Sequence, residues 1–126
     1  MSAEWRTVST AAGYTPDGNV LAVTFGDLER RQQIRVDDSL PDVIRLWSVV
    51  ARPAELREVD DPLMTAWRRN RLSELVGFTL DARGRMIGEA WVPLEGLTQA
   101  EWKVYVLALA RACDRFEYLL TGRDRE

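Results

Sequence analysis

The turn at residues 81–84 constrains the fold more than any other feature, because it lies between two runs of strand-forming residues, 75–80 and 85–92. A type I turn followed by glycine in the left-handed region closes a β-hairpin and fixes which residues face each other. With Asp81 opposite Arg85, side chains alternate between the two faces of the hairpin. The sequence therefore predicts the register of this hairpin as well as its existence.

The predicted register divides the hairpin into two faces. One face carries Val76, Phe78, Leu80, Met86, Gly88, Ala90 and Val92. The other face carries Leu75, Thr79, Ile87, Glu89 and Trp91. Since Gly88 and Ala90 are small enough for a helix to approach closely, we expect the first face to line the core and the second to face outward.

Alternating apolar residues predict further strands over 20–25, 30–36 and 43–50. Leu21, Val23 and Phe25 form the expected inward set of the first of these strands. A Pro-Asp-Gly turn within 15–19 precedes it, and we expect this turn to pair it with an N-terminal strand within residues 1–14.

Two helices are predicted from their end signals. Asp60 and Asp61 form an acidic cap before Pro62, which favours a helix through Asn70. Thr98 and Glu101 form a capping box for a long amphipathic helix that Gly122 ends.

These elements predict an α+β fold, an antiparallel sheet of about five or six strands with two helices packed on one face. The last helix should cover Val76, Phe78 and Ala90. The length of 126 residues fits a single domain over 1–126, with a variable N-terminal strand and turn at 1–18 and a frayed tail at 123–126.

Composition excludes several kinds of function. The chain has no histidine, which removes Ser-His-Asp and Cys-His catalysis and histidine-ligated zinc or haem. Its net charge of −3 provides no global attraction for nucleic acid or an anionic membrane. One cysteine, no signal peptide and no long apolar run indicate a cytoplasmic protein without membrane insertion.

The residues that could carry chemistry favour structural roles. The close carboxylate pairs Asp37/Asp38, Glu55/Glu58 and Asp60/Asp61 all lie beside turn or cap signals, where acids are expected. No oxygen-rich metal loop and no phosphate-binding glycine motif is present, so neither a metal nor a cofactor is expected. Cys113 falls on the inward stripe of the last helix and is expected to be a core residue.

Two surface hypotheses remain. Arg30, Arg31 and Arg35, with Arg68, Arg69 and Arg71 elsewhere, could hold phosphate or RNA, although a solvated face is the favoured interpretation. Five tryptophans cannot all fit one small core, so one or two should reach the surface. Trp47, Leu75, Ile87 and Trp91 are the candidate partner-binding residues of an apolar outer patch, unless a loop or the N-terminal strand covers it.

Five stretches carry a family resemblance, and they are Val23-Thr24-Phe25, Arg31-Gln32-Gln33-Ile34-Arg35-Val36, Leu46-Trp47-Ser48-Val49-Val50, Gly77-Phe78-Thr79-Leu80-Asp81 with Gly84, and Ala110-Arg111-Ala112-Cys113-Asp114-Arg115-Phe116-Glu117. Over residues 19–122 the chain resembles the superfamily that joins type III secretion chaperones of the CesT type with YbjN-like proteins. The resemblance implies a small, commonly dimeric, non-enzymatic protein whose apolar surface holds an extended client segment. Secretion chaperones begin with a helix, whereas residues 1–14 read as a strand here.

These observations lead to a functional prediction. We expect a non-catalytic peptide- or protein-binding module, resembling a secretion chaperone, that holds a partner segment on an apolar sheet face or edge. The alternative is a self-associating structural or regulatory subunit of a larger assembly. A small-molecule enzyme using Asp37 or Asp60 is the third, least favoured hypothesis.

Overall fold

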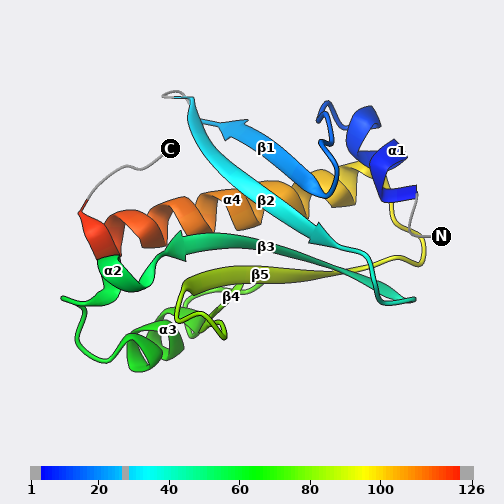
Figure 1. Cartoon of the computed structure of the whole chain (residues 1–126). Coiled ribbons are helices and arrows are strands. Elements are labelled where there is room, and N and C mark those ends of the chain that lie inside the picture. Colours follow the sequence, from blue (N-terminus) through cyan, green and yellow to red (C-terminus); the bar gives the residue numbers. More distant parts are fainter. Residues whose placement is uncertain (1–3, 27–28, 123–126) are drawn as a thin grey trace.

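The computed structural model describes residues 4–26 and 29–122, and these form an antiparallel sheet of five strands with four helices (Figure 1). The strands are β1 (Val20–Phe25), β2 (Arg30–Asp37), β3 (Val43–Ala51), β4 (Gly77–Leu80) and β5 (Met86–Pro93). The helices are α1 (Glu4–Ala11), α2 (Pro53–Leu56), α3 (Pro62–Asn70) and α4 (Gln99–Thr121). The strand order is β1-β2-β3-β5-β4. The predicted α+β class is confirmed, and the predicted tail at 123–126 lies outside the described residues.

The β4–β5 hairpin has the register that the turn predicts. Phe78 lies opposite Gly88 and Leu80 opposite Met86. The face that contains Phe78 and Gly88 lines the core. A Cβ atom placed on Gly88 would lie only 2.4 Å from the Cys113 Sγ atom of α4, so the absence of a side chain at Gly88 allows the helix to approach the sheet.

Helix α4 covers the inner face of the sheet, as predicted. Its capping box forms, with the Glu101 N–H donating to the Thr98 hydroxyl at 3.1 Å. Phe116 meets the Phe78 ring edge-on, with centroids 4.6 Å apart. Helix α3 packs beside α4, since Ala66 belongs to the same buried core and the Arg69 guanidinium lies 5.8 Å from the Phe116 ring centroid.

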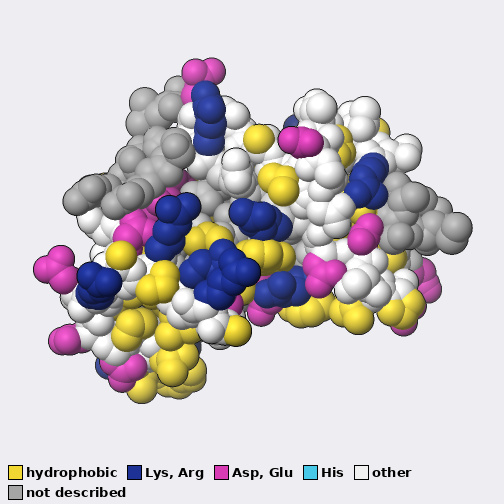
Figure 2. Space-filling model, viewed as in Figure 1, with side chains coloured by type: hydrophobic (Ala, Val, Ile, Leu, Met, Phe, Trp, Pro, Cys, Tyr) yellow, Lys and Arg dark blue, Asp and Glu magenta, His cyan; other side chains and the backbone are white. Residues whose placement is uncertain are grey.

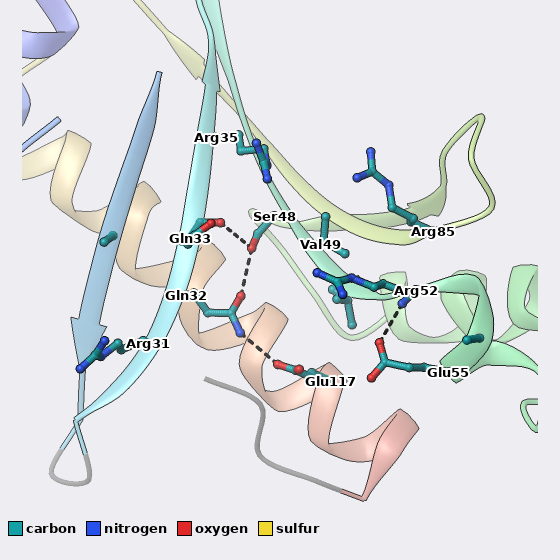
Figure 3. Close-up of a pocket in the computed structure, with 13 residues that line it drawn as sticks. Arg31, Gln32, Gln33, Arg35, Ser48, Val49, Arg52, Glu55, Arg85 and Glu117 are labelled. Carbon is teal, nitrogen blue, oxygen red and sulfur yellow. Dashed lines mark hydrogen bonds between the residues drawn. The ribbon is translucent and has the colours of Figure 1, made fainter. Parts of the chain in front are cut away.

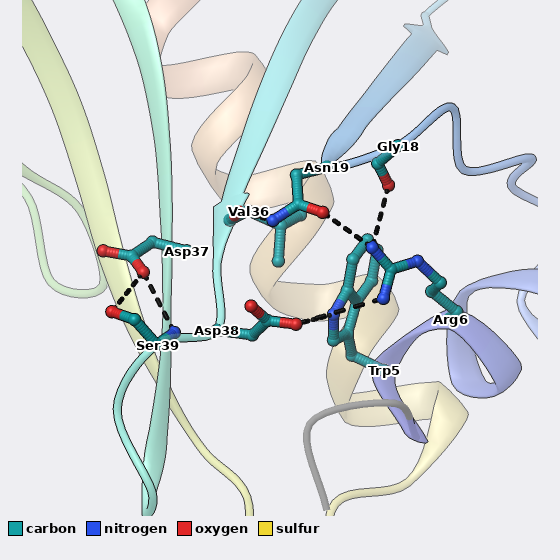
Figure 4. A network of polar contacts seen from close by, with 8 residues as sticks. All are labelled: Trp5, Arg6, Gly18, Asn19, Val36, Asp37, Asp38 and Ser39. Carbon is teal, nitrogen blue, oxygen red and sulfur yellow. Dashed lines mark hydrogen bonds and ion pairs between the residues drawn. The ribbon is translucent and has the colours of Figure 1, made fainter.

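The predicted N-terminal strand is wrong, because the chain begins with helix α1. Trp5, Val8, Ser9 and Ala12 recur at helical spacing, and Trp5 and Ser9 are fully buried. The Trp5 ring stacks on Trp102 of α4 with centroids 6.0 Å apart. Its Nε1–H donates to the Asp38 carboxylate at 2.8 Å (Figure 4). These long-range contacts stabilise a helix where the Pro-Asp-Gly turn had favoured a strand.

The predicted turn at 15–19 forms without the predicted hairpin. Asp17 and Val20 exchange two backbone hydrogen bonds across Gly18, which has a φ of 60°. This pair is an isolated bridge, so the turn carries the chain from α1 into β1 instead of joining two strands. Arg6 of α1 reinforces the turn by donating to the Gly18 carbonyl and to Asn19 Oδ1 (Figure 4). The first element of the described chain is therefore a helix.

Candidate functional site

The outer face of the sheet is the surface toward the viewer in Figure 1, and no helix of the described chain crosses it. Strand alternation decides which side chains it carries. These side chains are Arg31, Gln33 and Arg35 from β2, Arg45, Trp47 and Val49 from β3, and Ile87, Glu89 and Trp91 from β5. Arginine and tryptophan thus dominate a face that no helix within residues 4–26 and 29–122 covers.

Strands β2 and β3 separate along this face. Within the described chain their ladder consists of the pairs Arg35–Trp47, Val36–Leu46 and Asp37–Arg45. If it continued, Gln33 would lie opposite Val49, but the two strands diverge before that pair (Figure 1). A β-bulge between Val49 and Ala51 bends β3 where it diverges.

A cleft of about 780 Å³ lies between the diverging strands (Figure 3). Its rim carries the guanidinium groups of Arg31, Arg35, Arg52 and Arg85. This volume is within the range of ligand-binding pockets in proteins. The cleft is therefore large enough to hold a bound segment.

Polar side chains form the floor of the cleft. The Ser48 hydroxyl lies 2.8 Å from the Gln33 carbonyl and 2.9 Å from Gln32 Oε1, so its single proton is shared between two acceptors. Gln32 Nε2 donates to Glu117 of α4 at 3.2 Å. Gln32, Ser48 and Glu117 are buried at positions where the rest of the inner face is apolar. This network connects β2, β3 and α4 where the ladder ends.

The arginines on the rim are largely uncompensated. Arg31, Arg35 and Arg52 are exposed and form no ion pair with any residue that the structure describes. Arg85 pairs with Asp81 at 2.7 Å. Figure 2 shows basic side chains gathered in the middle of this face. The outer face is thus locally positive although the whole chain carries a net charge of −3.

Trp47 lies among three guanidinium groups. The Arg35, Arg45 and Arg85 side chains approach its ring centroid at 5.4, 5.5 and 5.6 Å. Arg45 also pairs with Glu89 at 2.5 Å and lies 6.0 Å from the Trp91 ring centroid. Cations over an aromatic face are attracted by the ring quadrupole. These contacts hold the arginines in place around a half-buried indole.

The four predicted partner-binding residues do not form one patch. Trp47 and Trp91 share the outer face, where both lie near Arg45 and Trp91 is 47% exposed. Ile87 points to the same face but is only 2% exposed. Leu75 is 43% exposed, yet it precedes β4 and lies outside the ladder with β5. Burial and register therefore leave two of the four on an accessible outer surface.

The arginines that the sequence grouped together lie on different faces of the sheet. Arg31 and Arg35 do share a strand face, but Arg30 points to the inner face and pairs with Asp114 of α4 at 3.0 Å. Sequence reasoning missed Arg52 and Arg85, which come from the end of β3 and from the residue before β5. Only the strand order places Arg52 and Arg85 beside β2. Arg45 could have been assigned to the outer face from the sequence, because it lies two residues before Trp47 on the same strand.

The acidic residues and the cysteine have structural surroundings. Hydrogen bonds from the Ser39 side chain and backbone lower the pKa of Asp37, and Asp61 caps α3 by accepting the Met64 N–H. Burial raises the pKa of the Cys113 thiol, and the neighbouring Glu117 and Asp114 raise it further. The predicted core role of Cys113 is confirmed. In residues 4–26 and 29–122 no cluster of three or more potential metal ligands occurs.

A second apolar surface, the α3 patch, consists of the exposed side chains Leu63, Met64, Trp67, Leu72 and Leu75. They lie on α3 and on the connection to β4. Figure 2 shows hydrophobic side chains gathered over the region of α3. No helix in the described ranges is long and apolar enough to span a bilayer. The chain therefore presents two distinct surfaces, the cationic outer face and the α3 patch.

Comparison with known proteins establishes the fold. No protein-family model matches the sequence, and no curated protein matches it. A chain of the ExsC–ExsE complex superposes with a TM-score of 0.65 at 14% identity, covering 96% of each chain. A chain of the HopA1–SchA chaperone–effector complex gives 0.59 at 14% identity, covering 97% of this chain and 96% of the other.

YbjN from E. coli has a TM-score of 0.55 at 11% identity, covering 95% of this chain and 88% of YbjN. An uncharacterized protein from Methanothermobacter thermautotrophicus gives 0.58 at 16% identity over nearly the full length of both chains. The resemblance to secretion chaperones and YbjN-like proteins that the sequence indicated is confirmed at the level of the fold.

Proposed function

We propose that this chain is a non-catalytic protein-binding module that holds an extended segment of a partner protein on the outer face of its sheet. The observation that carries the proposal is Trp91, a large aromatic side chain 47% exposed on a sheet face without a covering helix. Exposed tryptophan beside arginine is typical of the anchor residues of protein interfaces. Its fold, shared with a chain of the ExsC–ExsE complex and a chain of the HopA1–SchA chaperone–effector complex, supports the same function.

Trp47 and Trp91 are the proposed anchors. Ile87 is not a proposed anchor, because its side chain is buried and offers little area to a partner. Leu75 belongs to the α3 patch. The proposed partner surface is therefore smaller and more cationic than the sequence alone predicted.

The face of the sheet is a better docking surface than its β4 edge. Asn70 of α3 closes that edge by accepting the Phe78 N–H at 2.6 Å and donating to the Phe78 carbonyl at 3.0 Å. An edge strand whose backbone groups are already paired cannot add a further strand there. Binding on the face avoids this obstruction.

The test uses tagged protein in its native host with two variants. Trp91→Asp removes the exposed anchor, and Val104→Asp places the same charge on an exposed position of α4 away from the sheet. We expect both to melt close to the parent chain by circular dichroism. A partner recovered in stoichiometric amount with the parent and with Val104→Asp should fall about tenfold or more with Trp91→Asp.

Equal recovery with all three proteins would exclude the outer face as the binding surface. A large loss of thermal stability in Trp91→Asp would show instead that Trp91 is a core residue. Both results can be read from the same preparations.

The α3 patch favours a second candidate function, self-association. A two-fold interface uses one surface twice, so a single patch is enough to form a dimer. Trp67 of this patch is more than half exposed, with the Arg71 guanidinium 5.3 Å from its ring centroid. Sedimentation of the parent chain should show a dimer that Trp67→Asp converts to monomer. A monomeric parent chain over the micromolar range would exclude this role.

A further inference from the structure

We infer that the cleft between β2 and β3 binds an acidic, extended segment of the partner protein. This inference rests on the proposed function and specifies the chemistry of the partner at one place on the outer face. It is carried by three independent features of the cleft, which are its backbone groups, its uncompensated arginines and its polar floor.

The first feature is the main chain of the diverging strands. Strands offer the backbone groups of alternate residues to their two neighbours. The Val36 N–H donates to Asn19 on the β1 side at 2.8 Å. Arg31 and Gln33 therefore direct their backbone groups toward β3, and Val49 directs its own toward β2. These groups lie outside the ladder that the described residues form between the two strands.

An extended peptide would satisfy the backbone groups that remain open toward the cleft. Backbone donors and acceptors need partners when they are removed from water, and an extended peptide provides them at the matching spacing. The Arg35–Trp47 pair and the bond from the Ser48 hydroxyl to the Gln33 carbonyl at 2.8 Å close one end of the cleft. From Gln33 outward to Arg31 the strand advances about 7 Å, which accommodates two or three residues of extended chain.

The second feature is the charge of the rim. Arg31, Arg35 and Arg52 are exposed, and among the described residues none of them meets a carboxylate. Guanidinium groups bind carboxylates through two parallel hydrogen bonds. Sixteen of the seventeen basic residues of the chain are arginine, the residue suited to this geometry. The rim therefore complements glutamate or aspartate side chains on the bound segment.

The third feature is the polar floor. A segment bound in the cleft would meet the hydrogen-bonded side chains of Gln32, Ser48 and Glu117 instead of an apolar surface, which favours a polar segment. The two acids of the cleft already accept hydrogen bonds from the protein, Glu117 from Gln32 and Glu55 from the Arg52 N–H at 2.9 Å. Arg31, Arg35 and Arg52 thus have no carboxylate partner among the described residues and can bind an acidic ligand.

The same features favour a peptide over a single-stranded nucleic acid. Arginine and tryptophan also bind nucleotides. However, the backbone groups that β2 and β3 direct into the cleft have the spacing of a strand, which a polypeptide matches and a nucleic acid does not.

Fluorescence anisotropy with labelled synthetic probes tests the inference. The first probe is an eight-residue peptide of alternating glutamate and valine, and the matched control replaces each glutamate with lysine. We expect the acidic peptide to bind at least about tenfold more tightly than the basic one, with an affinity that falls as salt is added. Equal binding of the two peptides, or no binding of the acidic one, would overturn the inference.

Charge reversal localises the site. The double variant Arg31→Glu/Arg35→Glu should weaken the acidic peptide about tenfold or more. The control Arg111→Glu/Arg115→Glu has the same spacing and charge change on exposed positions of α4, and should leave binding unchanged. Circular dichroism confirms that both variants fold. If the two double variants bind alike, the cleft is not the site.

Two further probes separate this inference from the proposed function. N-methylation at alternate residues of the acidic peptide should lower its affinity about tenfold while keeping every carboxylate, since strand addition needs the N–H groups. Tighter binding of an oligothymidylate than of the acidic peptide would overturn the peptide assignment. A partner captured through Trp91 whose binding ignores the Arg31/Arg35 reversal would leave the proposed function standing and refute only the acidic cleft.

Discussion

Gly88 sets the distance between the sheet and α4. It lies on β5 facing the helix, and any side chain there would collide with Cys113 Sγ and with the Phe78 ring, whose nearest atom lies 3.0 Å from the position of a Cβ. Both neighbours are buried and cannot move into solvent. Packing at this one residue therefore controls how closely the longest helix covers the core.

Gly88→Ala should destabilise the protein by about 1–3 kcal/mol, because the added methyl group overpacks a closed contact. This corresponds to a Tm lower by roughly 4–12 °C, measured by circular dichroism. Gly77→Ala is the matched control on the neighbouring strand, where a Cβ meets nothing within 4 Å. Partial recovery in Gly88→Ala/Cys113→Ala would confirm the collision, and equal melting of the two alanine variants would contradict it.

At the scale of elements, the β4 edge depends on a side chain from a helix. Asn70 stands where a neighbouring strand would be and pairs both backbone groups of Phe78. The short strand β4 is thereby protected from further strand pairing. Helix α3 thus closes the sheet as well as covering part of the core.

Asn70→Ala should lower the free energy of unfolding in urea by about 1–3 kcal/mol, since two backbone groups lose their partners. Hydrogen exchange of the Phe78 amide should accelerate. Asn70→Asp is the informative comparison, because it keeps the acceptor for the Phe78 N–H and loses the donor to the carbonyl. Unchanged exchange in Asn70→Ala would show that the edge is protected by something else.

The β4–β5 turn depends on an ionised carboxylate. Although partial burial raises the pKa of Asp81, hydrogen bonds from the Arg85 backbone and side chain and from the Arg83 N–H lower it below its usual value. A carboxyl group with a lowered pKa in the folded state contributes stability above its unfolded pKa, and this contribution is lost as the pH falls through the folded pKa.

Asp81→Asn should therefore lower the Tm at pH 7 by roughly 3–6 °C. The difference from the parent chain should shrink as the pH falls from the ordinary carboxyl range through the lower pKa that Asp81 has in the folded state. Thermal melts from pH 7 to pH 3 measure this trend. A difference between the two proteins that stays constant across that range would exclude a role for the charge.

At the scale of the whole molecule, the N-terminal helix is part of the core. Trp5 joins three regions of the chain, since its ring stacks on Trp102 of α4 and its N–H binds Asp38 between β2 and β3. The Arg6 guanidinium lies 4.0 Å from the same carboxylate and adds a contact from α1 (Figure 4). Helix α1, the sheet and helix α4 should consequently unfold together.

Trp5→Ala should cost about 3–5 kcal/mol of stability, because it empties a fully buried site, whereas Trp5→Phe should cost about 1–2 kcal/mol by losing the bond to Asp38. Urea unfolding followed by far-UV circular dichroism and by tryptophan fluorescence measures both. A separate early transition of α1 in the parent chain would contradict this single cooperative unit.

The sequence by itself determined what depends on neighbours along the chain. The hairpin register through Asp81 and Arg85, the capping box at Thr98 and the inward positions of Leu21 and Val23 all follow from local geometry and alternation. The shared face of Trp47 and Arg35 follows in the same way, once their strands pair. This information covers most of the sheet and its longest helix.

Only the tertiary structure decided the N-terminal helix and the cleft. Trp5 and Ser9 are four residues apart, a spacing that fits both a helix and an alternating strand in so short a segment. Their burial depends on residues about a hundred positions away in α4. The cleft exists because β2 and β3 part after three pairs, where the Ser48 side chain bonds to Gln32 and to the Gln33 carbonyl. Strand order then brings Arg85 beside Arg35 and Trp47. Contacts between distant segments set these features, and local periodicity does not encode such contacts.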